Sequence, residues 1–209
     1  MTGEWRDPDD IAADLASGDA ARIRTGLADL RKFNKDGDEF ELPAFDSSLL
    51  APLGDAPPRD AVENLANLLS GYWAFVPRPS RDDVLIQLVE LAVRYANSSV
   101  AYTASIEIQS AADPVAAAHL AIGYLGTRGL ATPSEIEAAG TLIFYLLEAK
   151  LPVRRAVGEA LATWPAGKAR QKVVTYVRPM IEPDQRALVT PDGPPLTSPA
   201  ATRTTPRSG

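Results

Sequence analysis

Apolar residues recur at helical spacing through most of the 209-residue chain, and prolines or glycines interrupt the pattern at short intervals. Because an α-helix turns once every 3.6 residues, apolar side chains at positions i, i+4 and i+7 share one face. Ile23, Leu27 and Leu30 have this spacing. No segment of comparable length alternates apolar and polar residues, as a half-buried strand would. The sequence therefore predicts an all-α protein built from short helices.

Prolines and capping residues indicate where these helices begin. The pairs Asp7-Pro8, Asp113-Pro114 and Thr132-Pro133 each place a side-chain acceptor before a proline, which suits the first helical position. The helix that carries Val84 to Tyr95 is apolar around almost its whole circumference, so it is expected to be an inner helix. Predicted helices start near residues 7, 19, 60, 80, 99, 114, 134, 152 and 167.

Two segments lack the helical pattern. Residues 34–60 contain four prolines and seven acidic residues, which predicts a long acidic loop within a helical domain spanning residues 1–182. Residues 183–209 are rich in proline and threonine and are predicted to form a disordered tail. The acidic loop is expected to pack locally through its apolar side chains, which are Phe40, Leu42, Phe45, Leu49 and Leu50.

The composition excludes several kinds of site. The chain has no cysteine, so it offers no disulfide, thiolate zinc site or cysteine nucleophile. Its single histidine, His119, is expected to be packed beside the apolar stripe of its helix and hydrogen-bonded. No Gly-x-Ser-x-Gly turn and no glycine-rich phosphate-binding motif accompanies it. We therefore expect no enzymatic activity, no metal and no cofactor.

Charge and hydropathy indicate the cellular environment. Lys and Arg number 21 against 27 Asp and Glu, and the resulting net charge of −6 works against binding to nucleic acid or anionic lipid. No apolar run reaches the roughly 18 residues that a membrane span needs. No secretory signal is visible, so a cytoplasmic location is expected. Arginine outnumbers lysine 16 to 5, a usage typical of GC-rich bacterial genomes.

Two predicted helices have related sequences at a separation of 38 residues. Residues 114–125 and 152–163 share the initial proline, the valine that follows it and a central alanine. This pattern resembles the second helix of a HEAT repeat, and residues 19–30 fit the same description. The resemblance covers most of residues 8–181. It implies a short α-solenoid of helical hairpins that acts as a binding scaffold and carries no catalytic residues. A compact irregular helical bundle is the alternative fold.

The leading functional hypothesis is a non-enzymatic scaffold or adaptor that binds another protein. Because the chain is acidic, its partner is expected to be basic, and one version is an immunity or antitoxin-like inhibitor of a cationic enzyme. The acidic loop and the nearby aromatic cluster are the candidate docking surface. The predicted partner-binding residues are Asp36, Asp38, Glu39, Glu41, Tyr72 and Trp73.

The alternative hypothesis is a HEAT-like protein that binds nucleic acid or repairs DNA. It rests on a run of basic residues between positions 154 and 178, which would line a cationic groove. The overall negative charge makes this hypothesis the less favoured one. The candidate nucleic-acid-binding residues are Arg154, Arg155, Arg170 and Lys172.

Overall fold

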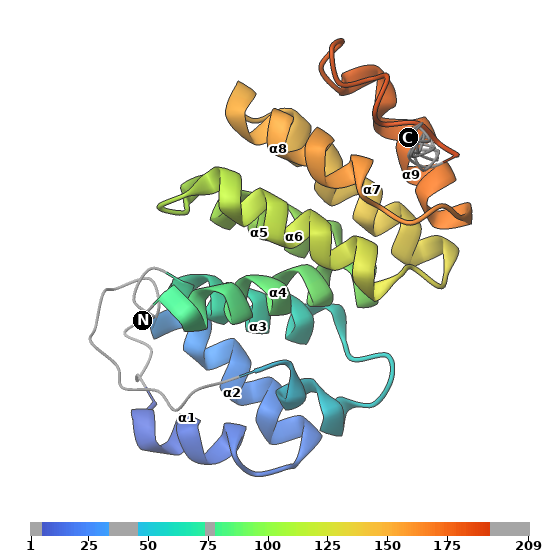
Figure 1. Cartoon of the computed structure of the whole chain (residues 1–209). Helices are drawn as coiled ribbons and strands as arrows, with labels where there is room; N and C mark the ends of the chain where they lie inside the picture. Colours follow the sequence, from blue (N-terminus) through green and yellow to red (C-terminus); the bar gives the residue numbers. More distant parts are fainter. Residues whose placement is uncertain (1–5, 34–45, 74–77, 193–209) are drawn as a thin grey trace, which may run out of the picture.

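A computed structural model describes residues 6–33, 46–73 and 78–192, with side chains except at residues 31–33, 72–73 and 78–80 (Figure 1). This described part of the chain is helical and contains no strand. The all-α prediction is therefore confirmed. The α-helices are α1 (Pro8–Leu15), α2 (Ala20–Phe33), α3 (Arg59–Trp73), α4 (Arg78–Arg94), α5 (Ser98–Ser110), α6 (Pro114–Arg128), α7 (Pro133–Leu147), α8 (Leu151–Ala162) and α9 (Lys168–Val177). The short 3₁₀ helices are η1 (Ser47–Leu53) and η2 (Arg178–Met180).

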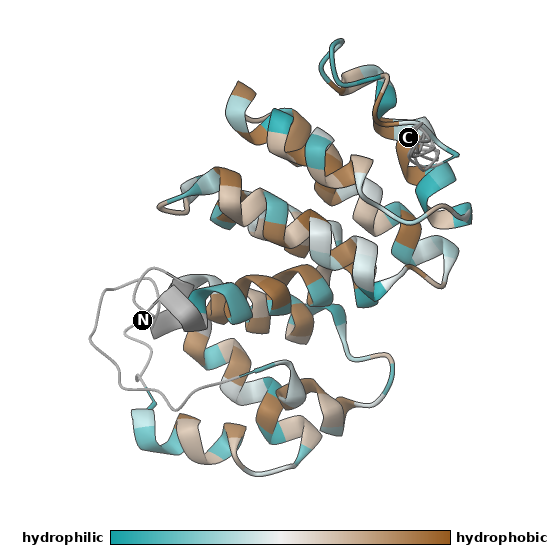
Figure 2. Cartoon of the chain, in the orientation of Figure 1, coloured by the Kyte–Doolittle hydropathy of each residue, from teal (hydrophilic) through white to brown (hydrophobic). Residues whose placement is uncertain are grey.

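The helices from α3 onward stack in two layers. In one layer α3, α5, α7 and α9 pack side by side in chain order, and in the other α4, α6 and α8 do the same. Helices α1 and α2 form a hairpin that packs on α3. Figure 2 shows apolar residues interspersed with polar ones along the helices, as expected for elements that bury one side. This stacking of successive hairpins is compatible with a helical-repeat fold.

Helix α4 lies in the centre of the stack. It packs against α3, α5, α6 and α7, and residues on several sides of it, including Leu85, Leu88 and Val93, are fully buried. An apolar circumference gives each of these neighbours a complementary surface. The sequence-based expectation of an inner helix is confirmed.

The predicted helix starts follow from local hydrogen bonding. Asp7 accepts a hydrogen bond from the backbone N–H of Asp9 at 2.9 Å, and Asp113 accepts one from Ala116 at 3.0 Å. At the start of α7, Thr132 and Glu135 form a reciprocal capping box. These side chains satisfy N–H groups that have no partner within the helix, which is why each helix begins where it does.

The two related helices α6 and α8 pack directly on each other. The indole N–H of Trp164, just after α8, donates to the carbonyl oxygen of Ile122 at 2.8 Å. A Cβ atom at Gly126 would lie 2.6 Å from the indole ring, so only glycine lets Trp164 approach α6 this closely. His119 pairs with Glu159 across the same interface at 3.1 Å, so the expected hydrogen bond is present, while its side chain is 40% exposed and therefore only partly packed.

The prediction of a loop across residues 34–60 is wrong for its second half. Residues 47–53 form η1, whose first N–H groups are capped by Asp46, and α3 already begins at Arg59. Leu50 is buried in the core and Leu49 packs against it, as expected, whereas Phe40, Leu42 and Phe45 lie outside the described residues. A 3₁₀ helix has no apolar repeat long enough to be seen in the sequence.

The predicted start of the disordered tail is also too early. Residues 183–192 form a series of turns in which Val189 is fully buried. Gln185 lies against Gly158 of α8 and donates to the carbonyl oxygen of Arg155 at 3.0 Å. Buried Val189 and the polar contacts of Asp184, Gln185, Arg186 and Thr190 dock this segment, and a proline-rich composition does not reveal them. The described fold therefore includes residues 183–192.

Candidate functional site

The predicted acidic docking residues cannot be placed in the fold. Asp36, Asp38, Glu39 and Glu41 lie outside the described residues, and α3 reaches Tyr72 and Trp73 without a described side chain at either position. The proposal that they bind a partner stays a prediction.

The predicted basic strip does not form one surface. Arg154 pairs with Glu182 at 3.0 Å, and the exposed Arg155 pairs with Asp184 at 2.8 Å. Arg170 is only 1% exposed, so of the four residues Lys172 alone is exposed without an ion pair to any described carboxylate. Helical spacing places basic residues near one another, but the C-terminal segment supplies carboxylates to two of them and covers the third.

Arg170 is a structural residue at the end of α8. Its guanidinium donates to the carbonyl oxygens of Leu161 at 2.6 Å, Trp164 at 2.7 Å and Thr190 at 2.9 Å. Carbonyl groups at a helix C-terminus carry partial negative charge, which a cation stabilises. Burial lowers the pKa of Arg170. No carboxylate among the described residues pairs with it, and its Nη2 atom has no hydrogen-bond partner there.

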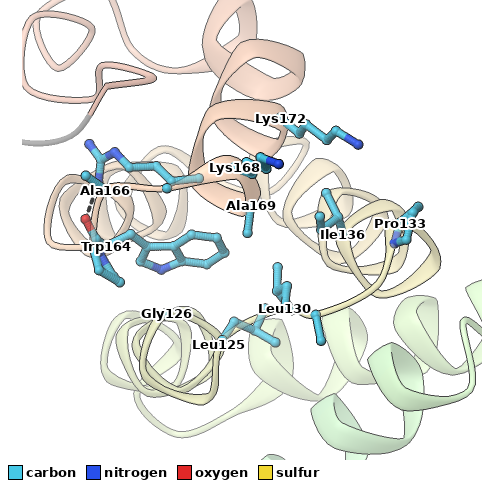
Figure 3. A pocket seen from close by; sticks show the side chains of 15 residues that line it. Leu125, Gly126, Leu130, Pro133, Ile136, Trp164, Ala166, Lys168, Ala169 and Lys172 are labelled. Carbon is cyan, nitrogen blue, oxygen red and sulfur yellow. Dashed lines mark hydrogen bonds between the residues drawn. The ribbon is translucent and has the colours of Figure 1, made fainter.

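A cavity of about 510 Å³ opens between α7, α9 and the two loops that precede them (Figure 3). Its lining is mostly apolar, and the ring of Trp164 lies beside α6 at one side of it. Ile136 and Pro133 of α7 lie across the cavity from this ring, and the first two turns of α9 place Lys168 and Lys172 near the edge. The apolar lining side chains include Leu125, Leu130, Pro133, Ile136 and Ala169.

A second cavity of about 300 Å³ adjoins the first and shares Pro133, Ile136 and Lys172 with it. It continues along α7 and α9 and is also lined by Glu137 and Tyr176. We call the two cavities together the α7–α9 groove. Its position follows from the stacking, because α7 and α9 are neighbours in one layer and Gly140 of α7 has no side chain where it faces Tyr176 of α9.

Two exposed tyrosines, and two half-buried aromatic residues beside one of them, lie on the same layer of helices. Tyr176 on α9 is 62% exposed and Tyr102 on α5 is 53% exposed. Tyr102 contacts Tyr145 of α7 edge to face, with ring centroids 5.4 Å apart, and Tyr145 contacts Phe144 in the same way at 5.9 Å. We call this surface the tyrosine face. A folded protein exposes a cluster of large aromatic groups mainly where something binds.

Other charged clusters have structural roles. Arg128 of α6 binds Glu90 of α4 and Glu135 of α7, and Tyr124 also donates to Glu90 at 2.9 Å. Burial opposes the charge of Glu135, but Arg128 and two backbone N–H groups outweigh this and lower its pKa. This cluster joins three helices.

Glu107 of α5 accepts a hydrogen bond from the Ser70 hydroxyl of α3. Burial raises the pKa of Glu107, and this hydrogen bond only partly opposes the shift. In the described part of the chain no group of three or more His, Asp or Glu side chains could hold a metal ion.

Comparison with known protein families, curated proteins and solved structures finds no match to this chain. Within residues 6–33, 46–73 and 78–192, no helix has the length and apolar content that crossing a membrane requires.

The groove could not be predicted from the sequence, because α7, α9 and the two loops that precede them build it together. Lys168 and Lys172 have the spacing of an ordinary solvated helix face, and nothing in their neighbours along the chain reveals an apolar cavity beside them. The one available signal is Tyr176, a large aromatic residue on the polar side of its helix.

Proposed function

We propose that this protein is a non-enzymatic, HEAT-like scaffold that binds another protein through the tyrosine face and the α7–α9 groove. The observation that carries the proposal is the exposure of Tyr102 and Tyr176 on one layer of helices, where Tyr176 also lines the second cavity of the groove. Tyrosine contributes a large contact area at small entropic cost, and binding energy in interfaces concentrates on such residues. Stacked hairpins present such residues on an extended surface.

The groove supports binding rather than catalysis. Its lining is mostly apolar, and Glu137 is the only carboxylate among the described residues that form it. A general acid–base mechanism needs a proton donor and acceptor placed around a reacting atom, and an apolar lining with one carboxylate does not supply them.

The acidic segment at residues 34–60 supports a second contact, with a basic partner. The net charge of −6 favours such an association, and an immunity or antitoxin-like inhibitor or an adaptor in a bacterial cytoplasm would use it. In this proposal the acidic segment accelerates the encounter, while the tyrosine face contributes the apolar contacts that hold the complex.

A photo-crosslinking experiment tests the proposal. A photoreactive amino acid replaces Tyr176 on the tyrosine face, or Glu159 on the exposed side of α8, in the organism that encodes the protein. We expect one protein to cross-link at position 176 and not at position 159. That protein is then purified and titrated against the wild type and against variants.

The double substitution Tyr102→Ser and Tyr176→Ser should weaken this binding about tenfold or more, because both side chains are exposed aromatic anchors. Leu151→Ser, which removes an exposed apolar side chain from α8, is the matched control and should change affinity less than about twofold. Unchanged binding by the tyrosine variant would refute the proposed surface.

A further inference from the structure

Lys168 and Lys172 differ from most other cations of the described fold. Arg6, Arg128 and Arg155, for example, each pair with a carboxylate. No described carboxylate pairs with either lysine, although both line the 510 Å³ cavity. The charge at this edge of the groove is therefore available to a partner.

One further feature makes the same edge electropositive. Helix α9 begins at Lys168 after Gly167, which supplies no side-chain cap, and the first residues of the helix line the cavity at the positive end of the helix dipole. Arg170 also lines the cavity, but its guanidinium donates to the carbonyl oxygens of Leu161, Trp164 and Thr190, so the two lysines are the charges available to a partner. The field at this edge favours a carboxylate group from outside the chain.

The cavity itself accepts an apolar group. A volume of about 510 Å³ lies within the range of roughly 300–1,000 Å³ that is usual for small-ligand sites, so one large side chain can enter it. Leu125, Ile136 and the indole of Trp164 give this side chain apolar contacts (Figure 3). Trp164 is only 3% exposed, so its ring forms a wall and is not available for stacking with a nucleic-acid base.

We propose that the α7–α9 groove binds an acidic peptide segment of a partner protein, a segment in which a large apolar residue stands next to aspartate or glutamate. The apolar side chain enters the cavity beside Trp164, and the carboxylate lies beside Lys168 and Lys172 at the edge of the cavity. Glu137, at the far end of the groove, repels a second carboxylate and so sets the direction of the segment. This inference rests on the proposed function, because it names the chemistry of a partner at the same surface.

A peptide selection tests the inference with the full chain. A displayed library of random peptides is selected on the wild-type protein and counter-selected on the double variant Lys168→Glu and Lys172→Glu. We expect the recovered peptides to share a leucine, phenylalanine or tryptophan beside an acidic residue. A synthetic peptide with that sequence is then titrated by fluorescence anisotropy.

Substitutions in the groove distinguish the contribution of the two lysine charges to peptide affinity from the contribution of the cavity. Lys168→Glu with Lys172→Glu should weaken the peptide about tenfold or more, whereas Lys168→Arg with Lys172→Arg should keep the affinity within about threefold. Lys150→Glu makes a matched change at an exposed lysine outside the groove and should have less than about a twofold effect. Ala169→Phe fills the cavity without changing charge and should also abolish binding. Melting temperatures of all variants establish that they are folded.

The outcomes distinguish this inference from the proposed function. Recovered peptides that depend on Tyr176 but carry no acidic residue would overturn the inference and retain the proposed function. A selection that enriches no peptide dependent on the groove or on Tyr176 would overturn both. Retardation of a short DNA duplex that the two glutamate substitutions abolish would also overturn the inference, since the groove would then bind phosphate.

Discussion

Two glycines on one helix provide an internal test of how the groove is built. Gly123 and Gly126 lie one turn apart on α6, and both are helical. A Cβ atom at Gly126 would lie 2.6 Å from Trp164, whereas a Cβ atom at Gly123 would meet nothing within 4 Å. We therefore expect the same substitution, glycine to alanine, to have opposite effects at the two positions.

Known magnitudes give the size of each effect. Alanine is better than glycine inside a helix by about 0.5–1 kcal/mol, and Gly123→Ala should gain this amount. Gly126→Ala gains the same but displaces Trp164, at a cost of about 1–3 kcal/mol for overpacking and about 1 kcal/mol for the lost hydrogen bond to Ile122. The net expectation is a loss of about 1–3 kcal/mol.

Thermal unfolding followed by circular dichroism measures both variants. In a folded unit of this size 1 kcal/mol corresponds to roughly 2–4 °C, so Gly126→Ala should lower the melting temperature by about 2–12 °C and Gly123→Ala should raise it by about 1–4 °C. If Gly126→Ala were as stable as Gly123→Ala, Trp164 would not lie on α6, and the wall of the groove would be wrongly placed.

Three further predictions concern the tail and the charged clusters. Removing residues 193–209 should leave the melting temperature nearly unchanged, whereas removing residues 183–209 should lower it by several degrees. The longer deletion also removes buried Val189 and the carbonyl oxygen of Thr190 that accepts a hydrogen bond from Arg170. Differential scanning fluorimetry compares the two deletions. Because burial raises the pKa of Glu107, ionising this carboxyl group lowers the stability of the folded chain. Glu107→Gln should therefore be more stable than the wild type near neutral pH. In urea unfolding this gain should vanish below about pH 4, where the carboxyl group is protonated in both the folded and the unfolded chain. Arg128→Met should cost about 2 kcal/mol near pH 7. Since the pKa of Glu135 is lowered, this cost should shrink as the pH falls below about 4 in the same urea assay.

Features that depend on neighbours along the chain could be predicted from the sequence. The start of α6 at Asp113-Pro114 and the inner position of α4 follow from capping and from apolar spacing, which are local properties. The 3₁₀ helix η1 could not be predicted, because it has no repeating pattern. Its Leu50 becomes buried only because α2 and α3 lie beside it.

The candidate binding surface likewise depends on contacts between segments that are distant in the sequence. Arg170 resembles a solvated basic residue in the sequence, and its burial depends on carbonyl groups of α8 and on Thr190, which lies 20 residues further along the chain. The α7–α9 groove likewise depends on which helices become neighbours in the stack. Net charge and the number of tyrosines can be counted in a sequence. The exposure of a tyrosine, and the place where an apolar cavity meets lysines that no described carboxylate pairs with, cannot.

The central claim is that the α7–α9 groove, with Tyr176 at its edge, forms the core of the binding surface. Titration of the isotopically labelled full chain with the selected peptide, followed by backbone amide chemical shifts, tests it most directly. We expect the largest changes in backbone amide chemical shift at residues 133–141 and 167–176, and none on the exposed side of α8 around Glu159. Changes concentrated around Glu159, or spread evenly over the helices, would contradict it.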